Sequence, residues 1–230
     1  MSATEARKRI ALFDLDHTLL PIDSDYAWGE FTQSIGWTDP AVFKRRNDEF
    51  YAHYTAGTLD IHDYVRFATE AIRLKGAEAA ARAHEQFMRE VIAPAIREEA
   101  RALVERHRAA GDEIAIVTAT NEFVTAPIAR ALGVCELIAV RLARGADGWI
   151  TGEIDGVASM REGKVRRVEE WLAARGLGWA AAEITFYSDS INDLPLLERV
   201  DHPVATNPDE RLRAIARERG WRILDLFPRT

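Results

Sequence analysis

The sequence predicts an α/β protein built on a doubly wound parallel sheet, with a small helical domain inserted after the first strand. Three short apolar runs carry this prediction, and each leads through a polar stretch into a helix-like pattern: residues 10–13, 114–117 and 184–187. Such alternation is typical of parallel strands covered by helices on both faces. About 100 residues separate the first two runs, far more than one crossover helix requires. We therefore expect a Rossmann-like core with an inserted cap.

The first run, Ile10-Ala11-Leu12-Phe13, is expected to be a buried strand that ends at Asp14. Residues 24–92 contain several helix-like patterns that are rich in aromatic residues, with breaks at Gly36, Gly57 and Gly76. We expect the core domain to comprise residues 1–22 and 93–230, and the helical cap to comprise residues 23–92. Most of the aromatic residues should form the cap's own core.

The remaining elements follow the second and third apolar runs. A helix over 96–111 should lead into the strand at 114–117, and a helix ending at Gly133 should follow that strand. Residues 136–156 resemble a hairpin that turns near Gly145 to Gly148, and a helix from Lys164 to Arg175 should come next. The third strand, at 184–187, completes the predicted core.

The composition excludes several classes of protein. A formal net charge of −7 over 230 residues argues against a general nucleic-acid binder. The chain has one cysteine, Cys135, which we expect to be buried and inert, so an internal disulfide is excluded. No apolar run approaches the roughly 20 residues needed to span a bilayer, and the polar N-terminus does not resemble a signal peptide. A cytoplasmic monomer or homodimer, with no nucleic-acid partner and no membrane span, is expected.

Polar residues that can carry chemistry follow the predicted strands. In a parallel sheet, ligands bind outside the carboxyl ends of the strands. The residues expected at this edge, or near it at the start of a helix, are Asp14, Asp16, Thr118, Lys164, Asp189, Asn192 and Asp193. Four converging carboxylates need a hard cation, and oxygen ligands without a His or Cys cluster suit Mg²⁺. The lysine, the threonine and the backbone N–H groups of the following helix can bind phosphate oxygens.

Asp14 and Asp16 can share the work on one substrate. Residues two apart in an extended chain point the same way, so both carboxylates can address a substrate from one side. One carboxylate can attack phosphorus and form an aspartyl-phosphate. The other can protonate the leaving oxygen and later take a proton from the hydrolytic water.

Four sequence motifs now identify a resemblance to a known family. "DLDHTLL" resembles the DxDxT signature of the haloacid dehalogenase (HAD) superfamily of phosphatases, and "IVTAT" resembles its second motif. Lys164 resembles the third motif and "YSDSINDLPLL" the fourth. The resemblance spans roughly residues 8 to 227. The inserted helices are similar to the C1 cap of the phosphoserine-phosphatase-like branch, subfamily IB.

The resemblance implies a role for each carboxylate at the edge. Asp14 would be the nucleophile and a Mg²⁺ ligand. Asp16 would be the general acid and base, with its backbone carbonyl on the metal. Asp189 would be the third protein ligand, and Asp193 would hold a metal-bound water or Lys164.

The resemblance also implies how the substrate is held. Lys164, Thr118 and Asn192 would bind the phosphoryl oxygens and stabilise the charge on the transferring group. Asp23 occupies the position of the acidic residue that reads the substrate amine in phosphoserine phosphatases, but the corresponding cap arginine is replaced by Ala68. Arg66 lies two positions away, and two helical positions rotate a side chain by about 200°, so Arg66 would face elsewhere.

The expected function is therefore a Mg²⁺-dependent phosphomonoester hydrolase that acts through an aspartyl-phosphate. Its substrate would be a small soluble phosphate ester, a phosphorylated amino alcohol or amino acid of the histidinol phosphate or phosphoserine type. Two alternatives remain open. A phosphotransferase would use the same residues, and a phospho-accepting signalling module would also cluster aspartates, a threonine and a lysine. Such a module should lack both the cap and a general acid two residues after the phosphorylated aspartate.

Overall fold

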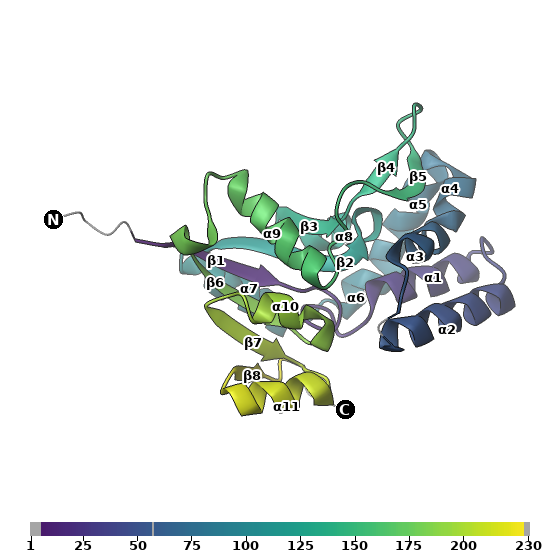
Figure 1. Cartoon of the computed structure of the whole chain (residues 1–230). Helices are drawn as coiled ribbons and strands as arrows, with labels where there is room; N and C mark the ends of the chain where they lie inside the picture. Colours follow the sequence, from purple (N-terminus) through teal and green to yellow (C-terminus); the bar gives the residue numbers. More distant parts are fainter. Residues whose placement is uncertain (1–5, 57, 228–230) are drawn as a thin grey trace.

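A six-stranded sheet forms the centre of the protein, whose computed structural model describes residues 6–56 and 58–227 (Figure 1). The strands run parallel in the order β3-β2-β1-β6-β7-β8. Their bounds are β1 Lys8–Phe13, β2 Glu113–Asn121, β3 Glu136–Val140, β6 Ala182–Ser188, β7 His202–Thr206 and β8 Arg222–Leu224. The three predicted strands are confirmed and lie side by side as β2-β1-β6.

The strand order reverses direction between β1 and β6, at the centre of the sheet. The chain moves outward from β1 through β2 to β3, and later returns to pair β6 with the other side of β1. Phe13 is paired with Ile116 on one side and with Tyr187 on the other, and the backbone N–H of Asp14 donates to the Tyr187 carbonyl at 2.9 Å. A ligand site is expected outside the carboxyl ends of the strands at such a reversal.

Helices cover both faces of the sheet, because the central strands are apolar on both sides. In β1, Ala11 and Phe13 belong to one hydrophobic cluster, while Ile10 and Leu12 belong to the other. The first cluster includes residues of α7 (Glu98–Ala109) and α8 (Glu122–Ala131). The second includes residues of α9 (Glu162–Ala173), α10 (Leu194–Leu197) and α11 (Glu210–Arg219). The predicted doubly wound α/β core is confirmed.

The helices inserted between β1 and β2 lie together beside the sheet (Figure 1). They are α1 Ser24–Ser34, α2 Pro40–Ala56, α3 Ile61–Ala68, α4 Glu70–Lys75 and α5 Ala77–Phe87, followed by a π-helical segment, Met88–Ile92, and α6 Ala93–Ala95. We call α1–α5 the inserted helices.

The aromatic residues of the inserted helices form two groups. Trp28, Phe31 and Phe87 contact one another, and Trp28 also packs edge-on against Phe123 of α8. This first group belongs to the same hydrophobic cluster as β1, so the expectation that the aromatic residues form a separate core is wrong for it.

The second aromatic group lies between α2 and α3. Phe43 and Phe50 of α2 contact Phe67 of α3, and Phe50 also contacts Tyr64. An ideal Cβ built on Gly29 of α1 would lie 2.1 Å from the ring of Phe43, so α2 crosses α1 where only glycine fits. Here the inserted helices do have a small core of their own.

The predicted hairpin over 136–156 is wrong in its first half. Residues 136–140 form β3 of the main sheet, and only β4 (Leu142–Arg144) and β5 (Ile150–Ile154) pair as a hairpin. The reason is burial, because Ile138, Ala139 and Val140 are all buried where β3 pairs with β2. The turn does fall at Gly145 to Gly148, and β5 contacts α3 and α4.

Cys135 is exposed, so its predicted burial is also wrong. Its neighbour Val134 is buried, and in the segment leading into β3 the cysteine faces the solvent instead. None of the helices in the described ranges combines the length and apolar character needed to cross a bilayer.

Candidate active site

Lys164 joins two of the predicted site carboxylates. Its Nζ lies 2.6 Å from Asp14 Oδ1 and 2.7 Å from Asp193 Oδ2, and all three side chains are buried. The Ser188 hydroxyl donates a further hydrogen bond to Asp193 Oδ2 at 2.7 Å. The chain thus brings together the residue after β1, the last residue of the 3₁₀ turn Ile191–Asp193, and the first turn of α9.

Burial controls the charge of this group. It raises the pKa of Asp14 from 3.8 to about 6, against the opposing charge of Lys164 and with a further contribution from the charge of Asp193. Burial alone would lower the pKa of Lys164, but the charges of Asp14 and Asp193 raise it above its usual value. Lys164 is therefore positively charged at neutral pH, and Asp14 is available there as a carboxylate.

Asp16 is held by two hydrogen bonds on the side toward the inserted helices. The backbone N–H of Ser24 donates to Oδ1 and the Thr120 hydroxyl donates to Oδ2, each at 2.8 Å. Burial, followed by the charge of Asp23, raises the pKa of Asp16 well above 3.8. A raised pKa favours the protonated form, which a general acid requires. Thr120 was not predicted, although it lies two residues after Thr118 in "VTAT".

Asp189 is bound to the loop that follows β1. The hydroxyl of Thr18, the threonine of "DLDHT", donates to Asp189 Oδ1 at 3.2 Å and accepts the Asp189 backbone N–H at 3.1 Å. Burial raises the pKa of Asp189 well above 3.8, and the charges of Asp14 and Asp193 add to the shift. Asp189 and Asp14 therefore repel each other where β1 and β6 end.

The donor set at this edge suits a hard divalent cation. Asp14, Asp16 and Asp189 offer only oxygen atoms, and the pKa of each is raised by burial and by neighbouring negative charge. Within residues 6–56 and 58–227, no three His, Cys, Asp or Glu side chains are grouped so that they could hold a metal ion by themselves. The implied ligand set has two carboxylates and one backbone carbonyl, so water or substrate oxygens would have to complete it.

Thr118 lies in β2, and Asn192 lies in the 3₁₀ turn that ends at Asp193. Thr118 is buried, and its hydroxyl accepts the backbone N–H of Thr120 at 3.1 Å. The Asn192 side-chain oxygen accepts a hydrogen bond from the Arg161 guanidinium at 3.3 Å. Burial raises the pKa of Tyr54 of α2, and the neighbouring side chains of Ser190 and Asn192 oppose this shift. Neither Tyr54 nor Arg161 belongs to one of the four motifs, so the sequence analysis did not identify them as site residues.

Asp23 caps the first of the inserted helices. Its Oδ1 accepts the backbone N–H groups of Asp25 and Tyr26, both at 2.9 Å, while the residue remains exposed beside Asp16. Arg66 does face elsewhere, because its guanidinium binds Asp63 and Glu153.

Asp25 is a buried carboxyl that the sequence analysis missed. The Tyr64 hydroxyl donates to its Oδ2 at 2.7 Å and the Asn121 side-chain amide donates to its Oδ1 at 3.4 Å. Burial raises the pKa of Asp25 to about 7, although the Tyr64 hydrogen bond opposes the shift and the charge of Asp23 adds to it. The pattern of apolar and polar residues along a helix does not reveal such contacts with residues far away in the chain.

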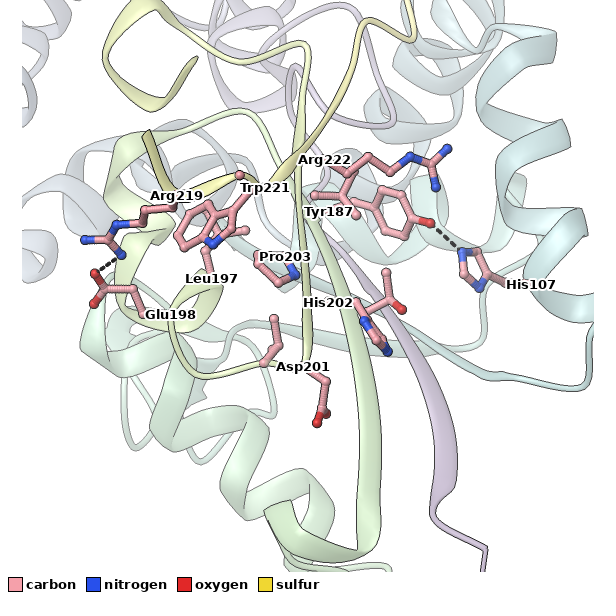
Figure 2. Close-up of a pocket in the computed structure, with 14 residues that line it drawn as sticks. His107, Tyr187, Leu197, Glu198, Asp201, His202, Pro203, Arg219, Trp221 and Arg222 are labelled. Carbon is pink, nitrogen blue, oxygen red and sulfur yellow. Dashed lines mark hydrogen bonds and ion pairs between the residues drawn. The ribbon is translucent and has the colours of Figure 1, made fainter. Parts of the chain in front are cut away.

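A cavity of about 940 Å³ lies elsewhere, around the amino-terminal ends of β7 and β8 (Figure 2). None of the predicted site residues lines it, so it is not the candidate active site. Two residues that line the cavity, His107 and Tyr187, are joined by a hydrogen bond of 2.7 Å between the imidazole and the Tyr187 hydroxyl. The Tyr187 ring stacks on Phe13, the residue directly before Asp14, with centroids 4.7 Å apart.

Comparisons with known sequences agree with this arrangement. A family model described as haloacid dehalogenase-like hydrolase matches residues 11–198. A histidinol-phosphatase of Neisseria meningitidis serogroup C is 42% identical over 219 residues, which cover 95% of this chain and 99% of that protein. A phosphoserine phosphatase of Mycobacterium tuberculosis is 33% identical over 218 residues, which cover 94% of this chain and 70% of that protein.

Solved structures show the same fold. A protein of unknown function from Bordetella pertussis Tohama I is 50% identical, with a TM-score of 0.91 and coverage of 96% of this chain and 100% of the other. A substrate-bound phosphoserine phosphatase is 17% identical, with a TM-score of 0.65 and coverage of 96% and 94%. The predicted resemblance is confirmed: the chain belongs to the haloacid dehalogenase-like hydrolases, and its relatives support a phosphatase within that family.

Proposed function

We propose that this protein is a Mg²⁺-dependent phosphomonoester hydrolase that works through an aspartyl-phosphate. The observation that carries the proposal is the buried Lys164 held between Asp14 and Asp193 at the point where the sheet reverses. A buried cation beside a carboxylate can attract a phosphoryl group and stabilise the charge that develops during its transfer.

In the first step, the Asp14 carboxylate attacks phosphorus and the bond from phosphorus to the ester oxygen breaks. Asp16 donates its proton to the leaving oxygen, which departs as the alcohol. The hydrogen bonds from Ser24 and Thr120 hold the Asp16 carboxyl in place for this transfer. Burial raises the pKa of Asp16, which favours the protonated form that this step requires.

In the second step, Asp16 takes a proton from water, and the water oxygen attacks the phosphorus of the aspartyl-phosphate. Inorganic phosphate leaves and Asp14 is regenerated as a carboxylate. The carboxylates of Asp14 and Asp189 and the backbone carbonyl of Asp16 would hold Mg²⁺. The ion would neutralise the carboxylates and polarise the phosphoryl oxygens.

The substrate that we propose is a phosphorylated amino alcohol of the histidinol phosphate type. A histidinol-phosphatase is the relative matched over almost its whole length at 42% identity. Asp23 is exposed at the start of α1, and the negative charge that it places beside Asp16 and Asp25 favours a cationic amine. The nearest arginine in the aligned helix, Arg66, is engaged by Asp63 and Glu153, so it offers little to a substrate carboxylate. We place this reaction in the cytoplasm, in keeping with the single cysteine.

Phosphate release from a panel of esters tests the proposal. The panel contains histidinol phosphate, phosphoserine, phosphothreonine, sugar phosphates and glycerol phosphates, each with Mg²⁺ and with EDTA. We expect Mg²⁺-dependent release, highest for histidinol phosphate and abolished in Asp14→Asn. Unchanged activity in Asp14→Asn would overturn the aspartyl-phosphate mechanism. Stable phosphorylation of Asp14 by acetyl phosphate without turnover would instead indicate a signalling module, and transfer to an added alcohol in preference to water would indicate a phosphotransferase.

A further inference from the structure

Asn192 lies between a guanidinium and a phenol. On one side, Arg161 Nη2 donates to Asn192 Oδ1 at 3.3 Å. On the other side lies Tyr54 of α2, whose pKa is raised by burial and lowered by the neighbouring side chains of Ser190 and Asn192. Asn192 directly precedes Asp193, which binds Lys164, so its side chain lies next to the proposed phosphate site.

The chemistry of these neighbours fixes the orientation of the amide. A guanidinium can only donate hydrogen bonds, so the Asn192 atom facing Arg161 must be the carbonyl oxygen. The amide nitrogen then points away from Arg161, with its two N–H groups directed elsewhere as donors. Phosphoryl oxygens accept hydrogen bonds, and an amide rotated by 180° would present its carbonyl oxygen to them instead.

The backbone of Arg161 supports a role for its side chain. The residue has φ of 52° and ψ of −124°, a conformation that residues with a Cβ rarely adopt. It directly precedes α9, and its carbonyl accepts the backbone N–H of Lys164 at 3.0 Å. Glycine would fit this turn without strain, and such strain in a native protein is concentrated at functional sites. The presence of arginine therefore suggests that the guanidinium itself is needed.

We propose that Arg161 is a positioning residue that holds the Asn192 amide with its N–H groups toward the phosphoryl group of the substrate. This inference rests on the proposed phosphatase function. Arg161 acts through Asn192, so removing Arg161 should weaken the binding of a phosphate group only while Asn192 is present.

A double-mutant cycle tests this coupling. The dissociation constant of inorganic phosphate is measured by calorimetry, with Mg²⁺, for wild type, Arg161→Met, Asn192→Ala and the double variant. We expect Arg161→Met to weaken binding roughly three- to tenfold, the size of one hydrogen bond, and to have no further effect in Asn192→Ala. Arg161→Lys, which keeps a donor, should recover part of the loss. Arg166→Met, at an exposed position of the same helix, is the matched control and should bind as wild type does.

The outcomes separate this inference from the function on which it rests. If Arg161→Met binds phosphate as wild type does, or if its effect multiplies with that of Asn192→Ala, the positioning role is wrong while the phosphatase proposal stands. If wild type binds no phosphate and releases none from the ester panel, both proposals fail.

Arg161→Gly distinguishes the side chain from the backbone turn. Glycine relieves the strain, so we expect this variant to melt at the same temperature as wild type or higher, yet to bind phosphate as weakly as Arg161→Met. Wild-type affinity in Arg161→Gly would show that the turn alone positions the site and would overturn the inference.

Discussion

Replacing Asp25 by asparagine should change how the stability of the protein depends on pH. Burial raises the pKa of Asp25 from 3.8 in the unfolded chain to about 7 in the folded protein. The folded state therefore binds this proton more tightly than the unfolded state does. The resulting stabilisation is fully present below about pH 4 and is lost as the pH rises through 7.

The size of the effect follows from the pH interval over which the folded protein keeps the proton. Each pH unit between the two pKa values changes the free energy of unfolding by about 1.4 kcal/mol, so wild type should lose roughly 2–3 kcal/mol from this group between pH 5 and pH 8. The side-chain amide of Asp25→Asn would not titrate, and its oxygen can still accept the Tyr64 hydroxyl. The variant should therefore gain stability relative to wild type by that amount over the same interval.

Urea unfolding at pH 5 and pH 8 measures this difference. Asp63→Asn, which removes a carboxylate that is 59% exposed on α3, is the control, and its stability difference from wild type should be nearly the same at the two pH values. A stability difference between Asp25→Asn and wild type that is the same at both pH values would refute the reasoning.

Four further predictions concern the site and its support. Asp16→Asn should slow the release of the alcohol in a single turnover about 10²- to 10⁴-fold for an alkyl phosphate but far less for p-nitrophenyl phosphate, whose leaving group needs no proton; equal losses in this first step would contradict the general-acid role. Lys164→Met should cost roughly 3–5 kcal/mol in metal-free urea unfolding, because it leaves two buried carboxylates unpaired. Lys164→Arg keeps the positive charge and should cost less. An equal cost would contradict the claim that the charge of Lys164 stabilises the two carboxylates. Mg²⁺ at 100 times its dissociation constant should add about 2.7 kcal/mol to the free energy of unfolding, and EDTA should remove it; an unchanged melting temperature would speak against the cation site. Gly29→Ala should destabilise by roughly 1–3 kcal/mol through its clash with Phe43, while Gly178→Ala, which meets open space, should not; similar melting temperatures would contradict the tight crossing.

The central strands and the carboxylates after them could be predicted because the signal is local. Four apolar residues in β1, and a run of Ile, Thr, Phe and Tyr in β6, stand directly before a polar stretch, and nothing outside the segment is needed to recognise them. The same local reasoning failed at residues 136–156. One continuous alternating stretch there divides at Arg141 between the main sheet and a separate hairpin, and burial against β2 decides the division.

The supporting contacts of the site could not be predicted, because they join segments that are far apart in the chain. Tyr64 reaches Asp25 across 39 residues, and Thr120 reaches Asp16 across 104. No fixed spacing in the sequence predicts either contact. A tyrosine on a helix could equally well belong to a hydrophobic core. The role of Arg161 could not be predicted either, since its unusual backbone angles have no signature in the sequence.

Helix α2 differs from its neighbours in how weakly it is tied to the rest of the fold. Of its side chains whose exposure the structure describes, Phe43 alone is buried, whereas α1 and α5 each place several residues in hydrophobic contact with other elements. Local opening free energy follows the number of buried apolar contacts, so α2 can detach at a small fraction of the free energy of global unfolding. Because Tyr54 of α2 lies near Ser190 and Asn192, we expect detachment of α2 to uncover the proposed phosphate site and to leave the sheet intact. Substrate entry would then require the exchange of one helix between attached and detached states, and mutations in α2 would alter the rate of that exchange before they altered the chemistry.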